Sequence, residues 1–458
     1  MRIKQPIYII GLLFFVFGFV TWLGSVLIPY LRIACELSSY QSYFVAFSFY
    51  ISYTLMAIPS SWVLKKTGFK KGMSLGLLVM ALGALLFIPA ALTRQYGLFL
   101  IGLFAQGAGM TLLQTAANPY ITILGPRESA AKRISIMGIC NGVAGMLAPV
   151  ILGTVILKDA DGLNAKIATM LPADKISSLQ QLASQAIVPY SIMAIILVLL
   201  ALLIIYSGLP DIDEDPEELV VTGSPNRKTS IWQFPHLLLG VFTLFCYVGV
   251  EVIAVDTITG YAEKLGLPLS KAKFFPSFTL LNMLLGYIIG IICIPRFIQQ
   301  EKALKWSAVA GLFFGTVALL SSGILSVSCI ALLGLANALI WPAIWPLAIN
   351  GLGRFTKTGA SLMIMAVGGG ALLPLLYGYL ADHFSAQSAY GIIIPIYGVI
   401  LYYAGYGHKI ITRLFTSLLC GYPSRPGQNI LILRYHSLLQ ELHNLLNLPQ
   451  VRCHRLYT

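Results

Sequence analysis

Long apolar runs separated by short polar segments make up most of this chain. A run of about 20 residues with almost no charge is long enough to cross the hydrocarbon core of a membrane as a helix. The sequence predicts an all-α polytopic membrane protein with twelve transmembrane helices in two six-helix bundles. The predicted spans are residues 7–31, 42–64, 73–92, 97–124, 134–157, 187–206, 236–260, 274–294, 304–325, 327–350, 359–380 and 389–407.

The overall composition agrees with a membrane protein. Hydrophobic residues make up 57% of the chain and charged residues 10%, and the mean hydropathy is +0.82. These values exclude a soluble fold and make the lipid bilayer an expected partner. The net charge of +13 does not indicate nucleic-acid binding, because most lysines and arginines fall in short loops between spans.

The same loop charges predict the orientation of the protein. Basic residues accumulate in cytoplasmic loops of membrane proteins. The pattern places both termini in the cytoplasm, with domains at 1–206 (first bundle), 207–235 (cytoplasmic linker), 236–408 (second bundle) and 409–458 (atypical basic tail). The predicted cytoplasmic loops contain Lys65, Lys66, Lys70, Lys71, Arg127, Lys132, Arg133, Arg296, Lys302, Lys305, Arg354 and Lys357.

Polar amides interrupt the fourth and fifth predicted spans. Gln114 and Asn118 are four residues apart and share one helix face, and Asn141 follows in the next span. An unpaired amide in hydrocarbon costs several kcal/mol, as an order of magnitude, so these groups must face protein or water. They either join neighbouring helices by hydrogen bonds or form a binding site for a neutral, hydroxyl-rich solute.

The second half of the chain repeats this arrangement. Trp345 and Pro346 correspond to Asn118 and Pro119, at an offset of about half the chain. Parallel halves with interrupted helices at corresponding places are typical of a transporter that rocks around a central site.

Aromatic residues complete the predicted site. Trp341 and Trp345 share a helix face. Pro342 and Pro346 interrupt the same helix and should free the carbonyls of Ala338 and Pro342. Sugars present C–H faces that pack on aromatic rings, while their hydroxyls need amide partners. Trp22 is a first-half counterpart that could equally be a packing residue. Asn282 and Asn337 are further candidate amides that could instead only join helices.

The run 114–120 (QTAANPY), the lysine-rich loop 64–72 and the run 341–370 resemble the major facilitator superfamily, in particular its fucose permease and glucose/galactose permease branch. The resemblance covers about residues 7–408. It implies the major facilitator fold, a bacterial inner-membrane location and import of a monosaccharide by cation symport. We expect a monomer, and no cofactor apart from the coupling cation.

Two positions depart from the fucose permeases. Those proteins have an aspartate where this chain has Ser25 and a glutamate where it has Gln114, and these two carboxylates are their proton-linked groups. Asn141 matches a sugar-contacting asparagine, whereas a nearby glutamine is replaced by Gly138. The coupling cation is therefore left open between Na⁺ and H⁺.

Glu251 and Asp256 are the two acidic residues within the predicted spans, both in the seventh. Carboxylates inside a membrane are costly and are candidate functional groups. Glu251 is about fifteen residues into its span, or roughly 22 Å at helical rise. Asp256 is nearer the outer end, where the alternative is a helix-end residue that faces water or caps a break. We predict that Glu251 and Asp256, with Ser25, form the cation-coupling region.

The favoured function is import of a hexose, glucose or galactose, by symport with a cation, and two alternatives remain. The chain could be a permease for fucose or another monosaccharide. It could also be a sugar sensor or scaffold that has lost transport, as the missing carboxylates at Ser25 and Gln114 would allow.

Seven scattered cysteines predict neither a disulfide nor a metal site. An enzyme is disfavoured because the sequence offers no Ser/His/Asp set, nucleotide-binding loop or metal cluster.

Overall fold

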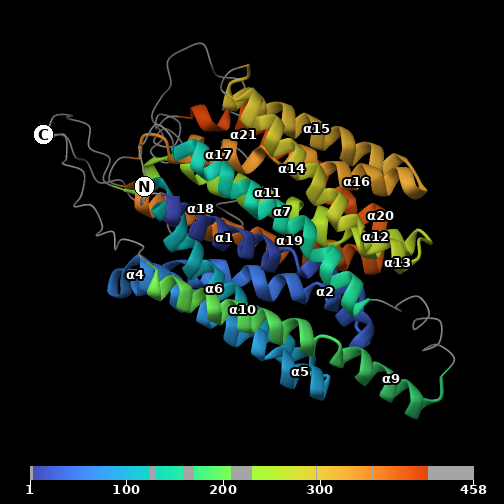
Figure 1. Cartoon of the computed structure of the whole chain (residues 1–458). Coiled ribbons are helices and arrows are strands. Elements are labelled where there is room, and N and C mark those ends of the chain that lie inside the picture. Colours follow the sequence, from blue (N-terminus) through green and yellow to red (C-terminus); the bar gives the residue numbers. More distant parts are fainter. Residues whose placement is uncertain are drawn as a thin grey trace, which may run out of the picture.

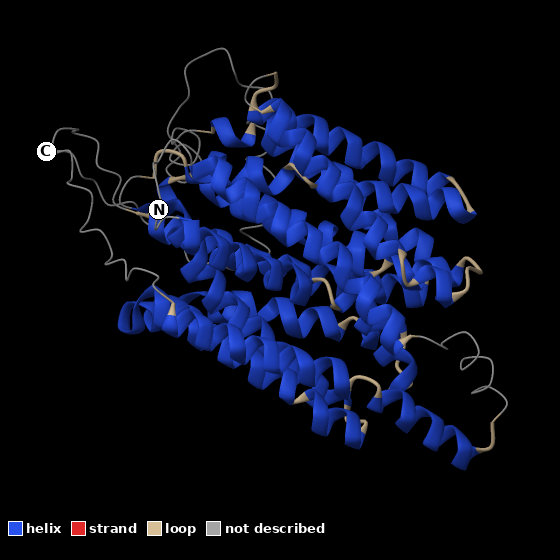
Figure 2. Ribbon diagram, viewed as in Figure 1, coloured by secondary structure: helices blue, strands red, loops and turns tan. Residues whose placement is uncertain are grey.

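The structure is a computed structural model. It describes residues 4–123, 130–157, 170–207, 230–294, 297–352 and 355–410, with the side chains of 118–123 and 130–135 among those not described. All regular structure in these ranges is helical (Figure 2). Most of the predicted linker and nearly all of the predicted tail lie outside the described residues.

The first half of the chain forms the helices of one bundle. They are α1 (Lys4–Thr21), α2 (Gly24–Ala34), α3 (Ser39–Ser42), α4 (Phe44–Leu85), α5 (Phe87–Thr93), α6 (Tyr96–Ile123), α7 (Ala130–Ile156), α9 (Pro172–Ser184) and α10 (Ile187–Tyr206).

The second half forms the other bundle. It consists of η2 (Ile231–Gln233), α11 (Pro235–Asp256), α12 (Ile258–Lys264), α13 (Leu269–Ala272), α14 (Phe275–Cys293), α15 (Gln300–Leu320), α16 (Gly323–Asn337), α17 (Ile340–Ile349), α18 (Thr356–Met365), η4 (Ala366–Gly368), α19 (Gly369–His383), α20 (Ala386–Ala389), η5 (Tyr390–Ile392), α21 (Ile393–Gly405) and η6 (Gly407–Lys409).

Eleven segments of the described residues are long and apolar enough to cross a membrane. One of them, Ser39–Thr93, has 55 residues. That length would reach roughly 80 Å as one helix, far more than the bilayer core of about 30 Å. Within it, Gly68 has a φ of 72°, in the left-handed region that glycine tolerates, and this bend divides α4 into two spans. The observed segments are thus consistent with the twelve predicted spans.

Several of the predicted spans, among them the first, the seventh and the tenth, are interrupted rather than continuous. The first span turns at Trp22 and Leu23, between α1 and α2, and the seventh turns at Thr257, between α11 and α12. The tenth span breaks at Ala338, between α16 and α17. Each break leaves backbone carbonyls without their usual helical partners, which other groups must satisfy.

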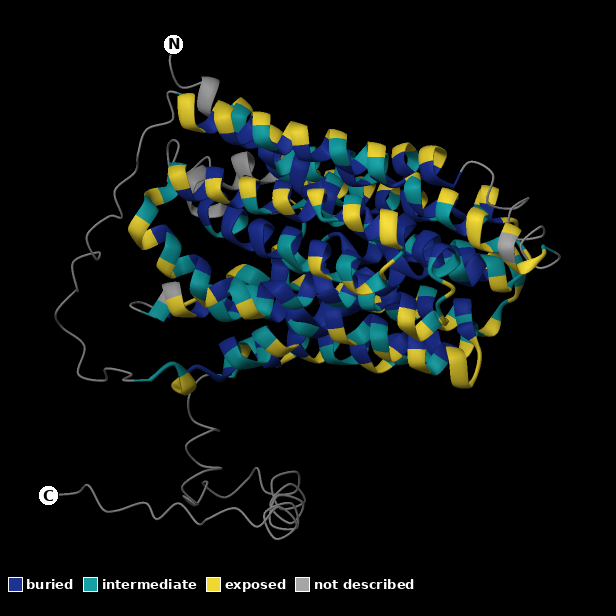
Figure 3. Ribbon diagram, turned by 90° about the horizontal axis from the view of Figure 1, so that it is seen from below, coloured by how far each residue is buried: buried dark blue, intermediate teal, exposed yellow. Residues whose placement is uncertain are grey.

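The helices form a broad bundle in which the two halves lie side by side. Figure 1 shows α4, α5 and α10 at one edge and α15, α16 and α21 at the opposite edge, with α1, α7, α11 and α19 between them. Exposed leucines and isoleucines cover the outside, and buried residues fill the inside (Figure 3). This distribution is expected of helices that face lipid on one side and protein on the other.

Glycines allow close approach of the central helices. A Cβ atom on Gly18 of α1 would lie 1.9 Å from the carbonyl oxygen of Asn141 in α7. A Cβ atom on Gly369 would lie 1.8 Å from the carbonyl oxygen of Phe245 in α11. Both positions therefore require glycine, and the helices that carry the candidate site are in backbone contact.

Candidate functional site

Glu251 lies among tyrosine side chains at the interface between the two halves. Its carboxylate is half-buried on α11 and is close enough to interact with the hydroxyl of Tyr247, one turn earlier on the same face. The hydroxyls of Tyr50 in α4 and Tyr287 in α14 are also within electrostatic range of this carboxylate. Glu251 therefore has polar neighbours from both halves of the chain.

The Tyr247 hydroxyl is buried without a partner that meets hydrogen-bond limits among the described residues. A hydroxyl in that position can donate to or accept from a ligand. Tyr247 and Glu251 together place a hydroxyl and a carboxylate at this interface.

Asp256 is the last residue of α11 and is 2% exposed. Neither of its carboxylate oxygens has a hydrogen-bond partner among the described residues. The cap residue of α12, Thr257, makes no side-chain capping bond. The alternative in which Asp256 faces water is therefore wrong, and no capping bond explains its position at the helix end.

Ser25 makes a side-chain hydrogen bond at the break in the first span. It is fully buried, and its hydroxyl donates to the carbonyl oxygen of Trp22 at 2.8 Å. The hydroxyl thus satisfies one of the carbonyls that the break leaves free. A direct role of Ser25 in cation coupling remains a prediction.

Trp22 packs into the interface between the halves. The indole is 6% exposed, and a Cβ atom on Gly145 of α7 would lie 2.4 Å from its Cδ1 atom. Leu280 and Met283 of α14 belong to the same apolar cluster. In this conformation Trp22 joins the two halves, and its role in sugar binding remains a prediction.

Trp341 and Trp345 stack on one another as their spacing predicted. Their ring centroids are 5.7 Å apart at an interplanar angle of 19°, and both are half-buried. The carbonyl of Pro342, between them, accepts a hydrogen bond from the Gln300 amide at 3.0 Å. This carbonyl is one that the second proline of the helix, Pro346, releases, as the sequence predicted.

The three central amides, Gln114, Asn118 and Asn141, differ in what the structure shows of their side-chain surroundings. Gln114 and Asn141 are half-buried, and neither makes a side-chain hydrogen bond to another described residue. Asn118 has its side chain outside the described residues, so its predicted role is neither supported nor opposed by its surroundings. Gln114 and Asn141 are therefore the two of these candidate amides that make no side-chain hydrogen bond within the described part of the chain.

The two weaker candidates join helices. The Asn282 amide in α14 donates to the carbonyl of Ala331 in α16 at 3.3 Å. The Asn337 Oδ1 atom in α16 accepts from the hydroxyl of Tyr397 in α21 at 2.8 Å. These bonds match the packing alternative, and a sugar-binding role for either amide remains a prediction.

Three polar residues near Asp256 were missed by the sequence reasoning. The hydroxyls of Tyr50 and Tyr190 and the Nε2 atom of Gln106 are buried without partners among the described residues. Gln106 could have been found, because it is an amide in the middle of an apolar run. The tyrosines could not, because tyrosines in apolar spans most often serve as packing residues.

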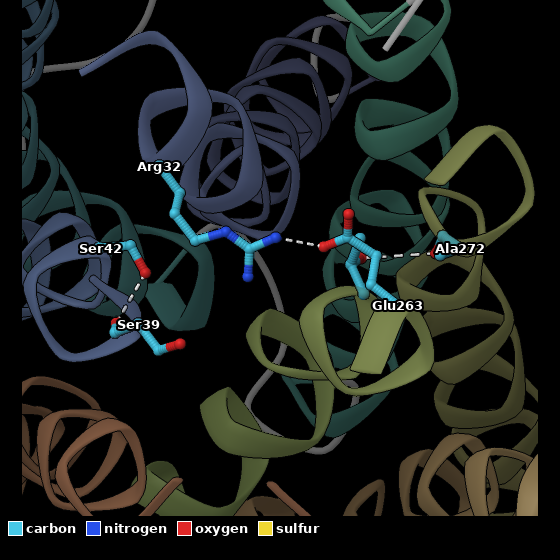
Figure 4. A network of polar contacts seen from close by, with 6 residues as sticks. Arg32, Ser39, Ser42, Glu263 and Ala272 are labelled. Carbon is cyan, nitrogen blue, oxygen red and sulfur yellow. Dashed lines mark hydrogen bonds and ion pairs between the residues drawn. The ribbon is translucent and has the colours of Figure 1, made fainter. Parts of the chain in front are cut away.

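Contacts between the halves close one end of the bundle, the end at which α2 and α12 terminate (Figure 1). Arg32 of α2 forms an ion pair with Glu263 of α12 (Figure 4). The Tyr40 amide donates to the Asp382 carboxylate at 2.8 Å. We call this region the outer end, since the loop charges predict that it faces away from the cytoplasm.

Two parallel helical bundles, interrupted helices and a polar centre between them define a membrane transporter rather than an enzyme. Specifically, the chain belongs to the Major Facilitator Superfamily, which its sequence matches over residues 10–373.

Several relatives resemble most of the chain. The glucose/galactose transporter of Brucella abortus is 33% identical over 87% of this chain and 93% of its own length. The L-fucose-proton symporter of Escherichia coli K12 is 29% identical over 82% of this chain and 87% of its own. Among solved structures, FucP in the outward conformation superposes with a TM-score of 0.67 at 27% identity, over 89% of this chain and 99% of that one.

Proposed function

We propose that this protein is a secondary active transporter that imports a hexose, glucose or galactose, by symport with a cation. The observation that carries the proposal is the Glu251 carboxylate at the interface between the halves, within range of tyrosine hydroxyls from both. A membrane-embedded carboxylate without a basic partner is costly unless it serves a ligand or an ion. The names of the relatives supply the sugar class.

The available groups suit a sugar. Sugar hydroxyls both donate and accept hydrogen bonds, and the amides of Gln114 and Asn141 can supply both kinds of partner. The stacked rings of Trp341 and Trp345 can pack against the C–H face of a pyranose. A neutral polyol can therefore bind without leaving buried polar groups unpaired, which would cost about 1–3 kcal/mol for each group.

Alternating access follows from the two-bundle architecture. Closing the outer end through Arg32 and Glu263 gives a state open or occluded toward the other end. Rocking the bundles about the central site would separate this pair and admit sugar from outside. We place the protein in the bacterial inner membrane as a monomer, with both termini in the cytoplasm.

Coupling requires a group whose charge is balanced differently in the two states. Glu251 is the proposed group, because Ser25 and Gln114 cannot carry charge. Its carboxylate would interact with the sugar hydroxyls or with the cation in one state and with tyrosine hydroxyls in the other. Cation movement and sugar movement would then depend on one another.

Uptake of radiolabelled glucose into cells that express the full chain tests the transport proposal. We expect uptake above that of cells with empty vector, and we expect excess unlabelled glucose and excess galactose each to abolish it. Excess fucose serves as the comparison and should compete at least tenfold more weakly. Labelled hexose uptake that ignores both glucose and galactose would overturn the proposed substrate, and cells with no uptake of any hexose would favour a sensor or scaffold.

A further inference from the structure

The break in the first span lies against a small cavity that does not belong to the sugar site described above. The cavity is lined by Thr21 and Gly24 at the break, Tyr50 of α4, Gln106 of α6, Tyr190 of α10 and Asp256 of α11. Its volume is about 10 Å³ of space open to the centre of a water-sized sphere. A space of about 10–15 Å³ on this scale holds one water or one small ion.

Unpaired polar atoms concentrate around this cavity. Among the described residues, ten buried side-chain nitrogen or oxygen atoms have no hydrogen-bond partner. Five of these ten belong to cavity-lining residues: the hydroxyls of Tyr50 and Tyr190, the Gln106 Nε2 atom, and both carboxylate oxygens of Asp256. Buried polar atoms are paired in almost all proteins, so the four unpaired oxygens around this cavity point to a ligand that pairs them, whereas the Gln106 Nε2 atom is a donor that a cation cannot pair.

A bound cation would balance the charge of the Asp256 carboxylate. Asp256 is 2% exposed, and a buried carboxylate without a partner costs several kcal/mol, as an order of magnitude. Two cationic side chains near the outer end bind elsewhere: Lys273 donates to the carbonyls of Gly153 and Leu157, and Arg32 pairs with Glu263. Asp256 itself has no hydrogen-bond or ion-pair partner among the described residues.

The surroundings favour a monovalent ion with oxygen ligands. Asp256 is the only acidic residue that lines this cavity in the described part of the chain, whereas divalent sites usually combine more charge or retain several waters. The Trp22 amide still donates to the Gly18 carbonyl at 3.3 Å, and Val20 and Thr21, the last residues of α1, line the cavity at the helix end, where carbonyls need other partners. Carbonyls released by broken membrane helices are typical ligands of sodium in transporters.

We propose that this cavity is a sodium site, in which the Asp256 carboxylate supplies the charge and the Tyr50 hydroxyl and carbonyls of the α1 break supply neutral oxygens. The inference rests on the proposed symport, for which it names the cation and its position. Tyr50 is within electrostatic range of both Asp256 and Glu251. A sodium ion at Asp256 can therefore influence the sugar site through the Tyr50 side chain, which lies within electrostatic range of both carboxylates.

Thermal unfolding of the purified full-length protein tests the site without any sugar. The midpoint is measured at constant ionic strength in sodium chloride, potassium chloride and choline chloride. We expect a rise of the midpoint that increases with the logarithm of the sodium concentration, as binding to the folded state alone requires. We expect no such rise in choline and a weaker one in potassium.

Variants locate the ion. Asp256→Asn should lower the sodium affinity by at least about 100-fold and so remove the sodium response. In choline chloride the variant should unfold at or above the temperature of the parent, because a buried charge has been removed. Tyr50→Phe should weaken sodium binding by about tenfold, the equivalent of one good ligand contact. The matched controls are Asp382→Asn, an exposed carboxylate, and Tyr403→Phe, a buried tyrosine whose hydroxyl donates to the carbonyl of His236 and does not line the cavity.

A parent protein that responds equally to sodium, potassium and choline would overturn the sodium site. Parent-like sodium affinity in both Asp256→Asn and Tyr50→Phe would overturn its position. Exchange of labelled glucose across liposomes by the parent is measured in parallel. Sodium binding without glucose exchange contradicts the proposed transport only, whereas exchange without sodium binding contradicts the sodium site only.

Discussion

The Oδ2 atom of Asp256 lies 3.2 Å from the position that a Cβ atom on Gly24 would occupy. This spacing leaves room for a hydrogen atom and not for a methyl group without movement of the carboxylate. Gly24→Ala should therefore displace Asp256 and weaken sodium binding by about tenfold, or about 1.4 kcal/mol. Titration of the sodium-dependent unfolding midpoint measures this change.

The control is Gly97→Ala in α6, where no atom lies within 4 Å of the added Cβ position. That variant should bind sodium as the parent does. A Gly24→Ala protein with parent affinity would show that the Asp256 carboxylate is not positioned by the helix break.

Glu251→Gln should separate coupling from sugar movement. The amide keeps the size and much of the hydrogen-bonding capacity of the side chain but loses its charge. We expect accumulation of glucose against a gradient to be lost, while exchange of labelled for unlabelled glucose stays within about tenfold of the parent. Both rates are measured in liposomes that contain the purified protein.

Glu301→Gln is a suitable control, because Glu301 is an exposed carboxylate beside His408 at the opposite end of the bundle. It should leave accumulation and exchange unchanged. If Glu251→Gln concentrates glucose as well as the parent does, Glu251 is structural, and the coupling must reside at Asp256 alone.

Gln114→Leu should weaken sugar binding. The sugar hydroxyls that the amide serves would be left unpaired, at a cost of about 1–3 kcal/mol, so the apparent affinity for glucose should fall by roughly 5-fold to 150-fold. The concentration dependence of initial uptake measures it. Gln180→Leu is the control, because this amide binds the carbonyls of Ala91 and Leu92 at the outer end. Equal apparent affinities in the two variants would assign Gln114 to helix packing.

The Arg32 and Glu263 pair should favour the state that is closed at the outer end. The side chains are 23% and 16% exposed, so the pair is partly screened and contributes on the order of 1 kcal/mol. Glu263→Arg should slow uptake several-fold by placing two like charges together, and the swap of Arg32→Glu with Glu263→Arg should restore it to within about twofold. Uptake that stays equally slow in the single and the double variant would show that the pair does not act as a gate.

The sequence predicted the fold well because lipid imposes simple rules. Each predicted span corresponds to an observed helical segment, and the fold and family are those that the motifs indicated. The long segment Ser39–Thr93 also fits, since Gly68 divides it at the predicted lysine-rich loop. The positions of transmembrane helices follow from the positions of apolar runs, which can be read directly from a single sequence.

The breaks in the helices were harder to predict. The stacking of Trp341 with Trp345 followed from their spacing, and Pro346 marked the freed carbonyl of Pro342. The turn at Trp22 has no proline, and Gly24 is the nearby residue that disfavours a continuous helix. A single glycine in an apolar run is too weak a signal to predict a break.

Of the residues that line the Asp256 cavity, the sequence indicated Asp256 as a functional candidate. A carboxylate in an apolar span indicates function on grounds of cost alone. Its neighbours Tyr50, Gln106 and Tyr190 come from three different helices, and no spacing rule connects them. Side chains that meet only through the packing of distant spans require the structure.

Accumulation of labelled glucose in liposomes that contain the purified protein tests the central claim of cation-coupled sugar transport most directly. Internal and external glucose concentrations are compared under an inward sodium gradient, under an inward proton gradient, and with neither. We predict that internal glucose rises above the external concentration under the sodium gradient and only reaches it when no gradient is present. Internal glucose that never exceeds the external concentration under either gradient would contradict the account.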